Sequence, residues 1–467
     1  MAQNFVACDR EQELLLPPSL CEWLPDGHLA WFVIDAVAAF DLSAFYAVYR
    51  VDGHGRPAHD PAMMVALLLY GYAIGERSSR RLERRCVEDV ATRVICANQA
   101  PDHTTIARFR QRHERALAGL FGEVLALCAE AGLVRVGMIA VDGTKVAANA
   151  ASQATRDYEQ IAREILAEAD AVDAEEDEQF GDARGDELPP ELATAQGRRG
   201  WLREAKRRLD EQRAEDARPV PRDRPDRLRE ARRRLGEEHQ VECQANAAYE
   251  AYRARGVDKN GKKFGRPPEP LTPPERPTGK INLSDLDSRN VKTSRGWVQG
   301  YNAQAVATED QIVIAAEVTV ASPDFGHLEP MVCAARDELR RIGVGQPPGV
   351  VLADAGYWHQ VQMERLLGDG LTVLIPPDAK KRAGARPGWD GGLYSFMRRV
   401  LDTDAGGELY AKRQTMIEPI FADTKFNRRI DRFLRRGRSA ARSEWRLTNA
   451  AHNLLKLWRH STVPATA

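Results

Sequence analysis

The feature that most constrains the fold is the apolar run within residues 134–146, VRVGMIAVDGTKV. Its apolar side chains first alternate with other residues and then follow one another, and glycines stand on either side. Such a run predicts a strand in the middle of a sheet, where both faces are covered. Asp142 closes the run, and the dipeptide Asp142-Gly143 predicts a turn at which the chain leaves the sheet.

A second segment repeats this pattern. Residues 349–354, GVVLAD, form a short apolar run that ends on Asp354 and is followed by alanine and glycine. A carboxylate at the end of a buried strand is costly unless it is solvated, paired or bound to a metal. If the two strands are neighbours, Asp142 and Asp354 emerge at the same edge, where open α/β sheets place their sites. A plain strand-end turn remains the alternative for Asp142 alone.

The rest of the chain predicts a mixed sheet. The expected order is an antiparallel hairpin over 297–308 and 311–320, a helix over 326–342, the strand over 349–354, a helix over 359–367, a strand over 371–375, a loop to about 407, and helices over 410–427 and 448–457. This order predicts an α/β fold with helices on both faces of a mixed sheet. It is the order of the ribonuclease-H-like fold, interrupted after the first strand.

Residues 1–133 predict an all-α domain that binds DNA. Apolar helices are expected over 29–40 and 61–74, with a basic helix start over 75–85. Asp102 or Thr104 can cap a further helix, which is expected to expose Arg108, Arg110, Arg112 and His113. A short capped helix rich in arginine is what a helix-turn-helix-like DNA reader requires, although a solvated helix face explains the same pattern.

Residues 151–280 change in composition. Ala, Glu, Arg and Leu dominate, which predicts a charged helical insertion laced with ion pairs; a coiled-coil hairpin is one form of it. The prolines of 267–277 predict a stiff linker back to the sheet. The predicted catalytic domain therefore comprises 134–150 and 281–460, and 461–467 is predicted to be a disordered tail.

Composition narrows the class of protein. The net charge is only −1 although 29% of residues are charged, so charge has to be considered segment by segment. The seven cysteines are scattered and lack metal-binding spacing, which is typical of a reducing compartment. Neither a secretory signal nor an apolar run of about 18 residues is found, so we expect a cytoplasmic protein without a membrane partner.

Glu418 supplies a third candidate carboxylate. It lies among apolar residues of a predicted helix, although a plain surface charge on that helix is an equal alternative. Residues 412–459 carry 13 Lys or Arg against 4 Asp or Glu, with phenylalanines interleaved, which favours a surface laid against a polyanion. Phosphoryl transfer on nucleic acid uses two divalent ions about 3.5–4 Å apart, and three convergent carboxylates can hold such a pair.

Together these segments resemble the DDE transposases of bacterial insertion sequences, in particular the insertion sequence 1182 group within the wider insertion-sequence 4/5 assembly. The resemblance rests on YGYAIGERSSRRLERRCVEDVATRVI, PDHTTIARFRQRH, VDGTKVAANAS, SRGWVQGYNAQAVAT, VTVASPDFGHLEPM, LADAGYW and IEPIFADTKFNRR. It implies a ribonuclease-H-like core in which Asp142, Asp354 and Glu418 are catalytic and hold two Mg²⁺, with Mn²⁺ as a substitute.

The resemblance also implies a Tyr–Arg–Glu–Lys signature around the glutamate. Tyr410, Arg413, Glu418 and Lys425 are similar to it, although the four residues between Arg413 and Glu418 are one more than in the family pattern. Lys425 is then expected to contact a DNA phosphate near the cleaved end. The predicted DNA-binding residues are Lys425, Arg413, Tyr410, Arg428, Arg429, Arg108 and Arg110.

The implied function is cleavage at the ends of an insertion sequence and strand transfer into target DNA. The implied partners are double-stranded DNA, as terminal inverted repeats and target, and further copies of the chain in a homodimer or higher multimer at the bacterial nucleoid. Three alternatives stay open: a metal-dependent DNA nuclease without strand transfer, a catalytically inactive DNA-binding regulator, and a coiled-coil interaction protein built on residues 150–260.

Overall fold

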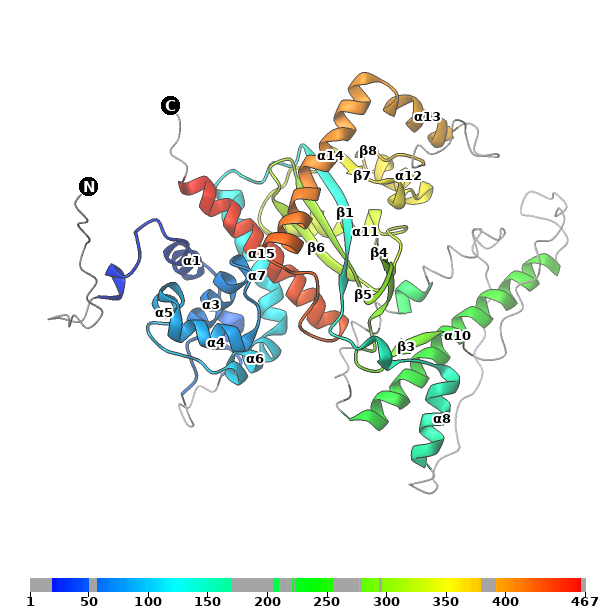
Figure 1. Cartoon of the computed structure of the whole chain (residues 1–467). Helices are drawn as coiled ribbons and strands as arrows, with labels where there is room; N and C mark the ends of the chain where they lie inside the picture. Colours follow the sequence, from blue (N-terminus) through cyan, green and yellow to red (C-terminus); the bar gives the residue numbers. More distant parts are fainter. Residues whose placement is uncertain are drawn as a thin grey trace, which may run out of the picture. The chain divides into compact units, whose positions relative to one another are not determined.

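The computed structural model describes residues 19–49, 57–169, 205–209, 213, 221, 223–254, 277, 279–293, 296–378 and 392–462. The chain divides into two compact units: unit 1 comprises residues 1–116 and 454–467, and unit 2 comprises residues 117–453. Figure 1 labels their helices and strands. The domain boundaries that the sequence suggests stay predictions.

Unit 1 is helical throughout its described part. Its elements are η1 (Leu20–Glu22), α1 (Leu29–Ala38), α2 (Ser43–Tyr46), α3 (Pro61–Ala73), α4 (Ser79–Glu88), α5 (Val90–Ile95) and α6 (His103–Arg112). Proline occupies the first turn of α3, where its missing N–H has no cost. Of the two predicted caps of α6, Asp102 is the one used: its carboxylate accepts the N–H of Thr105 at 2.8 Å.

Unit 2 is built on a mixed sheet of six strands. The strands are β1 (Met138–Ala147), β4 (Arg289–Thr293), β5 (Gly296–Thr308), β6 (Val313–Thr319), β7 (Val350–Ala353) and β8 (Thr372–Leu374). Their order is β4-β5-β1-β7-β8, with β6 also paired to β5. β1, β7 and β8 are parallel, while β5 is antiparallel to β1, β4 and β6. The predicted hairpin and mixed sheet are confirmed.

β1 is longer than predicted. Residues 139–141 pair with both β5 and β7, and the strand then continues along β5 alone as far as Ala147. The predicted turn at Asp142-Gly143 is therefore wrong. The reason is the length of β5, whose 13 residues supply backbone partners for β1 after β7 has ended at Ala353.

Helices cover the sheet and one of its edges. α11 (Leu328–Arg341) packs on β5 and β6, α12 (Gln360–Gly368) on α11 and β8, and α14 (Asp404–Ala422) on β1, β5 and β7. Two further side chains bond the backbone of β6. Asn453 bonds both the N–H and the carbonyl of Val313, and Arg438 Nε donates to the Val318 carbonyl at 2.9 Å. α15 (Arg438–Thr462), which carries both side chains, thus covers the free edge of β6.

Two predictions about the last third of the chain are wrong. The predicted loop to about 407 contains α13 (Gly392–Leu401) and the start of α14, which is capped by Thr403. The helix predicted over 410–427 is found as the end of α14 and the π-helix η5 (Asp423–Asn427), after which Arg429 has a φ of 54°; the second difference is the start of the last helix. Helix resumes only at Arg438, ahead of the predicted start at 448.

Before the sheet, α7 (Glu114–Glu130) leads into β1.

The longest elements in the described part of the insertion are helices, as predicted: α8 (Tyr158–Ala169) and α10 (Arg224–Ala254) pack on each other. They share a small apolar core beside the two-stranded sheet of β2 (Thr155–Asp157) and β3 (Lys280–Asn282). Residues 170–204 and 255–276, which include most of the predicted linker, lie outside the described residues. No helix in the described ranges is long and apolar enough to cross a membrane.

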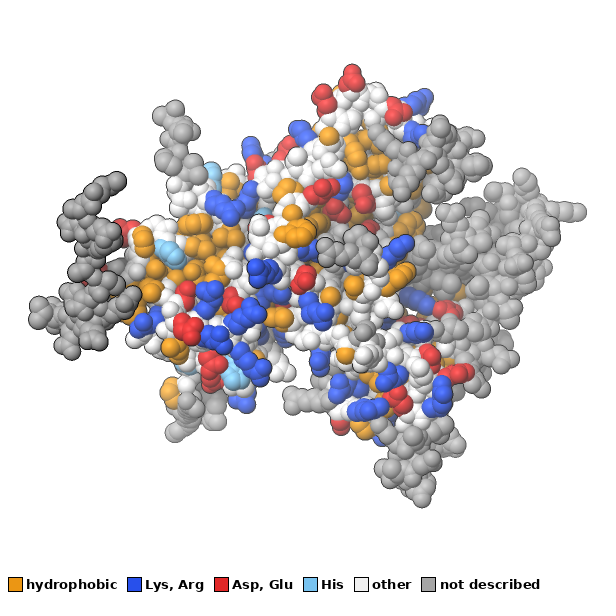
Figure 2. All heavy atoms as spheres, viewed as in Figure 1, with side chains coloured by type: hydrophobic (Ala, Val, Ile, Leu, Met, Phe, Trp, Pro, Cys, Tyr) orange, Lys and Arg blue, Asp and Glu red, His pale blue; other side chains and the backbone are white. Residues whose placement is uncertain are grey.

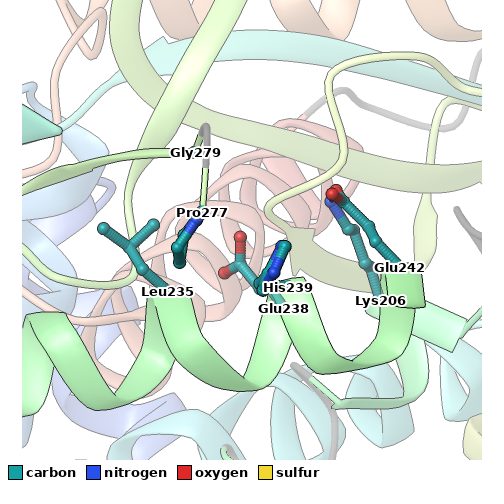
Figure 3. A pocket seen from close by; sticks show the side chains of 7 residues that line it. All are labelled: Lys206, Leu235, Glu238, His239, Glu242, Pro277 and Gly279. Atoms are coloured by element: carbon teal, nitrogen blue, oxygen red, sulfur yellow. The ribbon is translucent and has the colours of Figure 1, made fainter. Parts of the chain in front are cut away.

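A small cavity lies against α10, far along the chain from the predicted catalytic residues. Its volume of ≈ 10 Å³ suits about one water molecule. Figure 3 shows its lining, which consists of Lys206, Leu235, Glu238, His239, Glu242, Pro277 and Gly279. Lys206 pairs with Glu242, so the charged groups there are already engaged with each other. We therefore assign no substrate to this cavity.

Candidate active site

The two predicted aspartates follow neighbouring parallel strands. The last residue pair between β1 and β7 is Val141–Ala353, so Asp142 and Asp354 each come directly after it. The expectation that these two strands are neighbours is therefore confirmed. Asp354 begins the short helix η4 (Ala355–Tyr357), and its Oδ1 accepts the N–H of Gly356 at 2.8 Å.

Asp142 is largely buried, with 15% of its side chain exposed. Its Oδ1 accepts the N–H of Gly143 at 2.7 Å, and its Oδ2 accepts Arg413 Nη1 at 2.8 Å. Burial, together with the carboxylates of Asp354 and Asp324, raises the pKa of Asp142 to about 6, although Arg413 opposes the rise. Negative charge is therefore concentrated at this edge of the sheet.

Arg413 joins two of the three predicted catalytic carboxylates. It projects from α14 with only 11% of its side chain exposed, and its Nη2 lies 3.2 Å from Glu418 Oε1 while Nη1 binds Asp142. Glu418 itself is 51% exposed, because the neighbouring Met416, Ile417 and Ile420 occupy the buried face of α14. Glu418 thus lies on a partly buried helix, as expected, with its own side chain on the exposed side.

The helix around Glu418 contains a proline that the strand hairpin accommodates. Pro419 has no N–H to give to the carbonyl of Thr415, one turn earlier. Gln311, in the turn between β5 and β6, donates its Nε2 to that carbonyl at 2.8 Å. This contact ties the segment of α14 that carries Glu418 to the sheet.

The other two residues of the predicted signature lie beside these groups. Lys425 donates its Nζ to the carbonyl of Lys145 on β1 at 2.9 Å, and burial lowers the pKa of Lys425. Tyr410 lies one helical turn before Arg413, and burial raises the pKa of its hydroxyl. Both side chains are half-buried.

Of the two arginines that follow Lys425, one is buried. Arg428 has 4% of its side chain exposed; it donates to the carbonyl of Thr448 and to Thr424 Oγ1, both at 2.9 Å, and pairs with Asp423. Its prediction as a DNA contact is therefore wrong, because its guanidinium joins η5 to α15. Arg429 is exposed.

The same division occurs in α6 of unit 1. Arg108 and Arg112 are exposed, whereas Arg110 is 6% exposed and its guanidinium lies 5.8 Å from the ring of Tyr72. The predicted exposure of Arg110 and His113 is wrong, because both share the buried face of the helix with Phe109. Figure 2 shows Lys and Arg side chains gathered over α4 and α6. The exposed arginines of α4 are Arg80, Arg81 and Arg84.

The predicted carboxylates do not form a ready metal site. Within the described ranges, no three Asp, Glu, His or Cys side chains are grouped so that they could hold an ion. Their chemistry nevertheless fits Mg²⁺ or Mn²⁺, which prefer oxygen ligands. Burial and like charge raise the pKa of both Asp142 and Asp354, and a divalent cation would relieve that repulsion. Such a cation would compete with Arg413 for Asp142 Oδ2.

Sequence reasoning missed one carboxylate at this edge. Asp324, between β6 and α11, bonds the side chain of Lys145 on β1, and burial together with Asp324 raises the pKa of Asp354. The segment that contains Asp324 belongs to the resemblance described above, but nothing local to it separates this aspartate from an ordinary loop residue. Its only sequence signal is its place between a predicted hairpin and a predicted helix.

Two family models match parts of the chain. One, a transposase domain (DUF772), covers residues 18–112, and the other, a transposase DDE domain, covers residues 392–458. These matches indicate a transposase, a class of protein that acts on DNA. The second match includes Arg413, Glu418 and Lys425, while Asp142 and Asp354 lie outside both. No curated protein and no solved structure matches the chain.

Proposed function

We propose that this protein is an insertion-sequence transposase of the insertion sequence 1182 group that cleaves DNA at the ends of its element and joins those ends to target DNA. One observation carries the proposal: Asp142 and Asp354 follow adjacent parallel strands, and Arg413 links Asp142 to Glu418 on a helix within the segment that matches a transposase DDE domain. The strand and helix order supports a ribonuclease-H-like core for unit 2.

Asp142, Asp354 and Glu418 are the catalytic residues of this proposal. They would hold two divalent ions, which supply charge neutralisation and activation of the attacking oxygen. The raised pKa of Asp142, about 6, still leaves its carboxylate ionised for the most part at pH 7. Arg413 lies between Asp142 and Glu418 and could release one of these carboxylates to bind a DNA phosphate instead. A guanidinium group binds carboxylate and phosphate in the same forked geometry.

The reaction consists of two phosphoryl transfers. In the first, water attacks the phosphorus at the element's end, the bond to the 3′ oxygen breaks, and a 3′-hydroxyl is freed. In the second, that hydroxyl attacks a target phosphodiester in line, and the target's own 3′ oxygen leaves. Lys425, half-buried beside β1, is assigned to a phosphate next to the cleaved bond, with Tyr410 packed beside Arg413.

DNA ends would be bound by unit 1 and by the basic surface after Glu418. The exposed residues assigned to phosphate contacts are Arg108, Arg112 and the arginines of α4 in unit 1, and Arg429 in unit 2. Pairing of two ends requires at least two copies of the chain. The protein would then act on the chromosome in the bacterial cytoplasm.

The proposal is tested by a strand-transfer assay. Purified full-length protein is incubated with labelled DNA carrying the element's terminal inverted repeats, a target plasmid and Mg²⁺. We expect labelled ends joined to the plasmid. Cleaved ends without joined product would instead support the metal-dependent nuclease, and DNA binding without cleavage would support the inactive regulator.

A further inference from the structure

Asp324 gathers three donors on a single carboxylate oxygen. Its Oδ1 accepts Lys145 Nζ at 3.0 Å, and Asn302 Nδ2 and Gln304 Nε2 at 2.8 Å each. Asn302 and Gln304 are buried, and the Asp324 side chain is only 19% exposed. A carboxylate oxygen with three donors has no lone pair left for a further ligand.

The three donors lie on β1, which contains Asp142, and on its neighbour β5. Gln304 pairs with Gly143 across β1 and β5, and Asn302 pairs with Lys145, so these four residues share one face of the sheet. Because successive residues of a strand point to opposite faces, Asp142 is on the other face, where it meets Arg413. Asp324 and Arg413 therefore approach β1 from opposite sides.

One glycine lets the backbone of β1 approach Asp324. A Cβ at Gly143 would lie 2.7 Å from Asp324 Oδ1 and 2.2 Å from Gln304 Nε2, so this contact requires the residue after Asp142 to lack a side chain. At Gly356, two residues after Asp354, a Cβ would lie 3.7 Å from Asp324 Cβ, which is an ordinary van der Waals distance. Asp324 therefore lies against both segments, and it is the segment of β1 that depends on glycine.

The contacts of Asp324 continue into the rest of the site. The buried hydroxyl of Tyr357, just after Asp354, donates to Gln304 Oε1, and Trp445 Nε1 of α15 donates to the Gln304 carbonyl at 2.8 Å. On the other side, the carbonyl of Lys145 accepts the Nζ of Lys425. Asp324 thus connects β1, β5, the segment after β7 and the proposed DNA-binding lysine.

We propose that Asp324 is a positioning residue for the divalent-cation site of Asp142, Asp354 and Glu418, an inference that rests on the proposed function. Its carboxylate fixes side chains of β1 and β5 next to the part of β1 that carries Asp142, and its charge, only partly offset by Lys145, adds to the negative potential at the two aspartates.

The test measures Mn²⁺ binding to the full-length protein, without DNA, by isothermal titration calorimetry. Asp324→Asn keeps the shape of the side chain and removes its charge; we expect it to weaken Mn²⁺ binding by about 10- to 100-fold, as for other residues that position metal ligands. Lys145→Gln removes the opposing ammonium, and we expect it to bind Mn²⁺ at least as tightly as the wild type. Asp337→Asn, an exposed change on α11, is the control.

The two variants separate an effect of the Asp324 charge from an effect of the Lys145–Asp324 bond alone. If only that bond mattered, both variants would weaken binding, so weaker binding by Lys145→Gln would overturn the inference even if Asp324→Asn did not fold. Binding by Asp324→Asn within twofold of the wild type would also overturn it. If Asp142→Asn abolishes binding while Asp324→Asn retains it, only this inference fails; a wild-type protein that binds no Mn²⁺ would overturn the proposed function as well.

Discussion

Two arginine-rich segments of the molecule, one in each unit, both place an exposed arginine next to a buried one or separated from it by one residue. Helix α6 contains Arg108 and Arg110, and the segment after Lys425 contains Arg428 and Arg429. Arg108 and Arg429 are exposed, whereas Arg110 and Arg428 are buried; the third arginine of α6, Arg112, is also exposed. A basic stretch thus predicts a basic surface, but the fold decides which of its arginines reach that surface.

The two buried arginines differ in how their charge is met. Arg428 pairs with Asp423 and bonds Thr448 and Thr424. Arg110 has the ring of Tyr72, and its Nε and Nη2 find no hydrogen-bond partner among the described residues. The first is therefore a structural cross-link of unit 2. Arg110 is a buried cation that lies against an aromatic ring. Its loss of hydration is therefore offset less completely than that of Arg428, which has a carboxylate and two hydrogen-bond acceptors.

The largest expected effect concerns Arg428. We expect Arg428→Ala to lower the free energy of unfolding by about 3 to 5 kcal/mol, because it leaves the carboxylate of Asp423 without its buried partner. Arg429→Ala is the matched neighbour, and we expect a loss of under about 1 kcal/mol from that exposed position. Urea unfolding of both variants measures the difference. Equal losses would remove the distinction between the two arginines.

Burial also decides the charge of a histidine, His327. Burial, with Arg207 adding to it, lowers the pKa of His327 to about 4. Since this folded-state value is below the unfolded value of about 6.5, the unfolded chain takes up the proton first as the pH falls. The stability due to neutral His327 is therefore present above about pH 6.5 and is lost progressively towards pH 4.

Because of His327, we expect the free energy of unfolding of the wild type to fall by about 2 kcal/mol when the pH is lowered from 7 to 5. His327→Gln should flatten the pH dependence by that amount. His460→Gln, at an exposed position near the end of α15, is the matched control. Unfolding midpoints in urea at the two pH values test this, and parallel curves for the wild type and His327→Gln would contradict it.

The smallest expected effect is on DNA affinity. If exposed Arg108 contacts a phosphate, Arg108→Ala should reduce the slope of log affinity against log salt by about 1, because one fewer counterion is released. Arg110→Met, at the buried position, should leave that slope unchanged. Fluorescence anisotropy with duplex DNA at several salt concentrations measures both. A changed slope for Arg110→Met alone would reverse the assignment.

Much of unit 2 could be predicted, because apolar runs in the sequence indicate buried strands directly. The runs that end at Asp142 and Asp354 predicted two strands, and these strands are neighbours in the sheet. The end of β1 could not be predicted in this way. The Asp142-Gly143 dipeptide is a good turn former, but the long β5 keeps the chain extended through it.

The rest of the site depends on contacts between distant segments. Asp324 belongs to it because the β6–α11 connection folds onto β1, more than a hundred residues away in sequence. Arg428 leaves the surface because the carbonyl of Thr448 accepts its guanidinium, and Thr448 belongs to another helix. Neither partner is visible in the local sequence, so residue type alone could not separate Arg428 from Arg429.

The central claim is that Asp142 is catalytic, and the strand-transfer assay tests it most directly with Asp142→Asn. We predict that this variant binds DNA with the element's ends as tightly as the wild type, within about threefold, and forms neither cleaved nor joined product, because a neutral amide cannot replace a metal-binding carboxylate. Asp337→Asn should react like the wild type. Cleavage by Asp142→Asn at the wild-type rate would contradict the account.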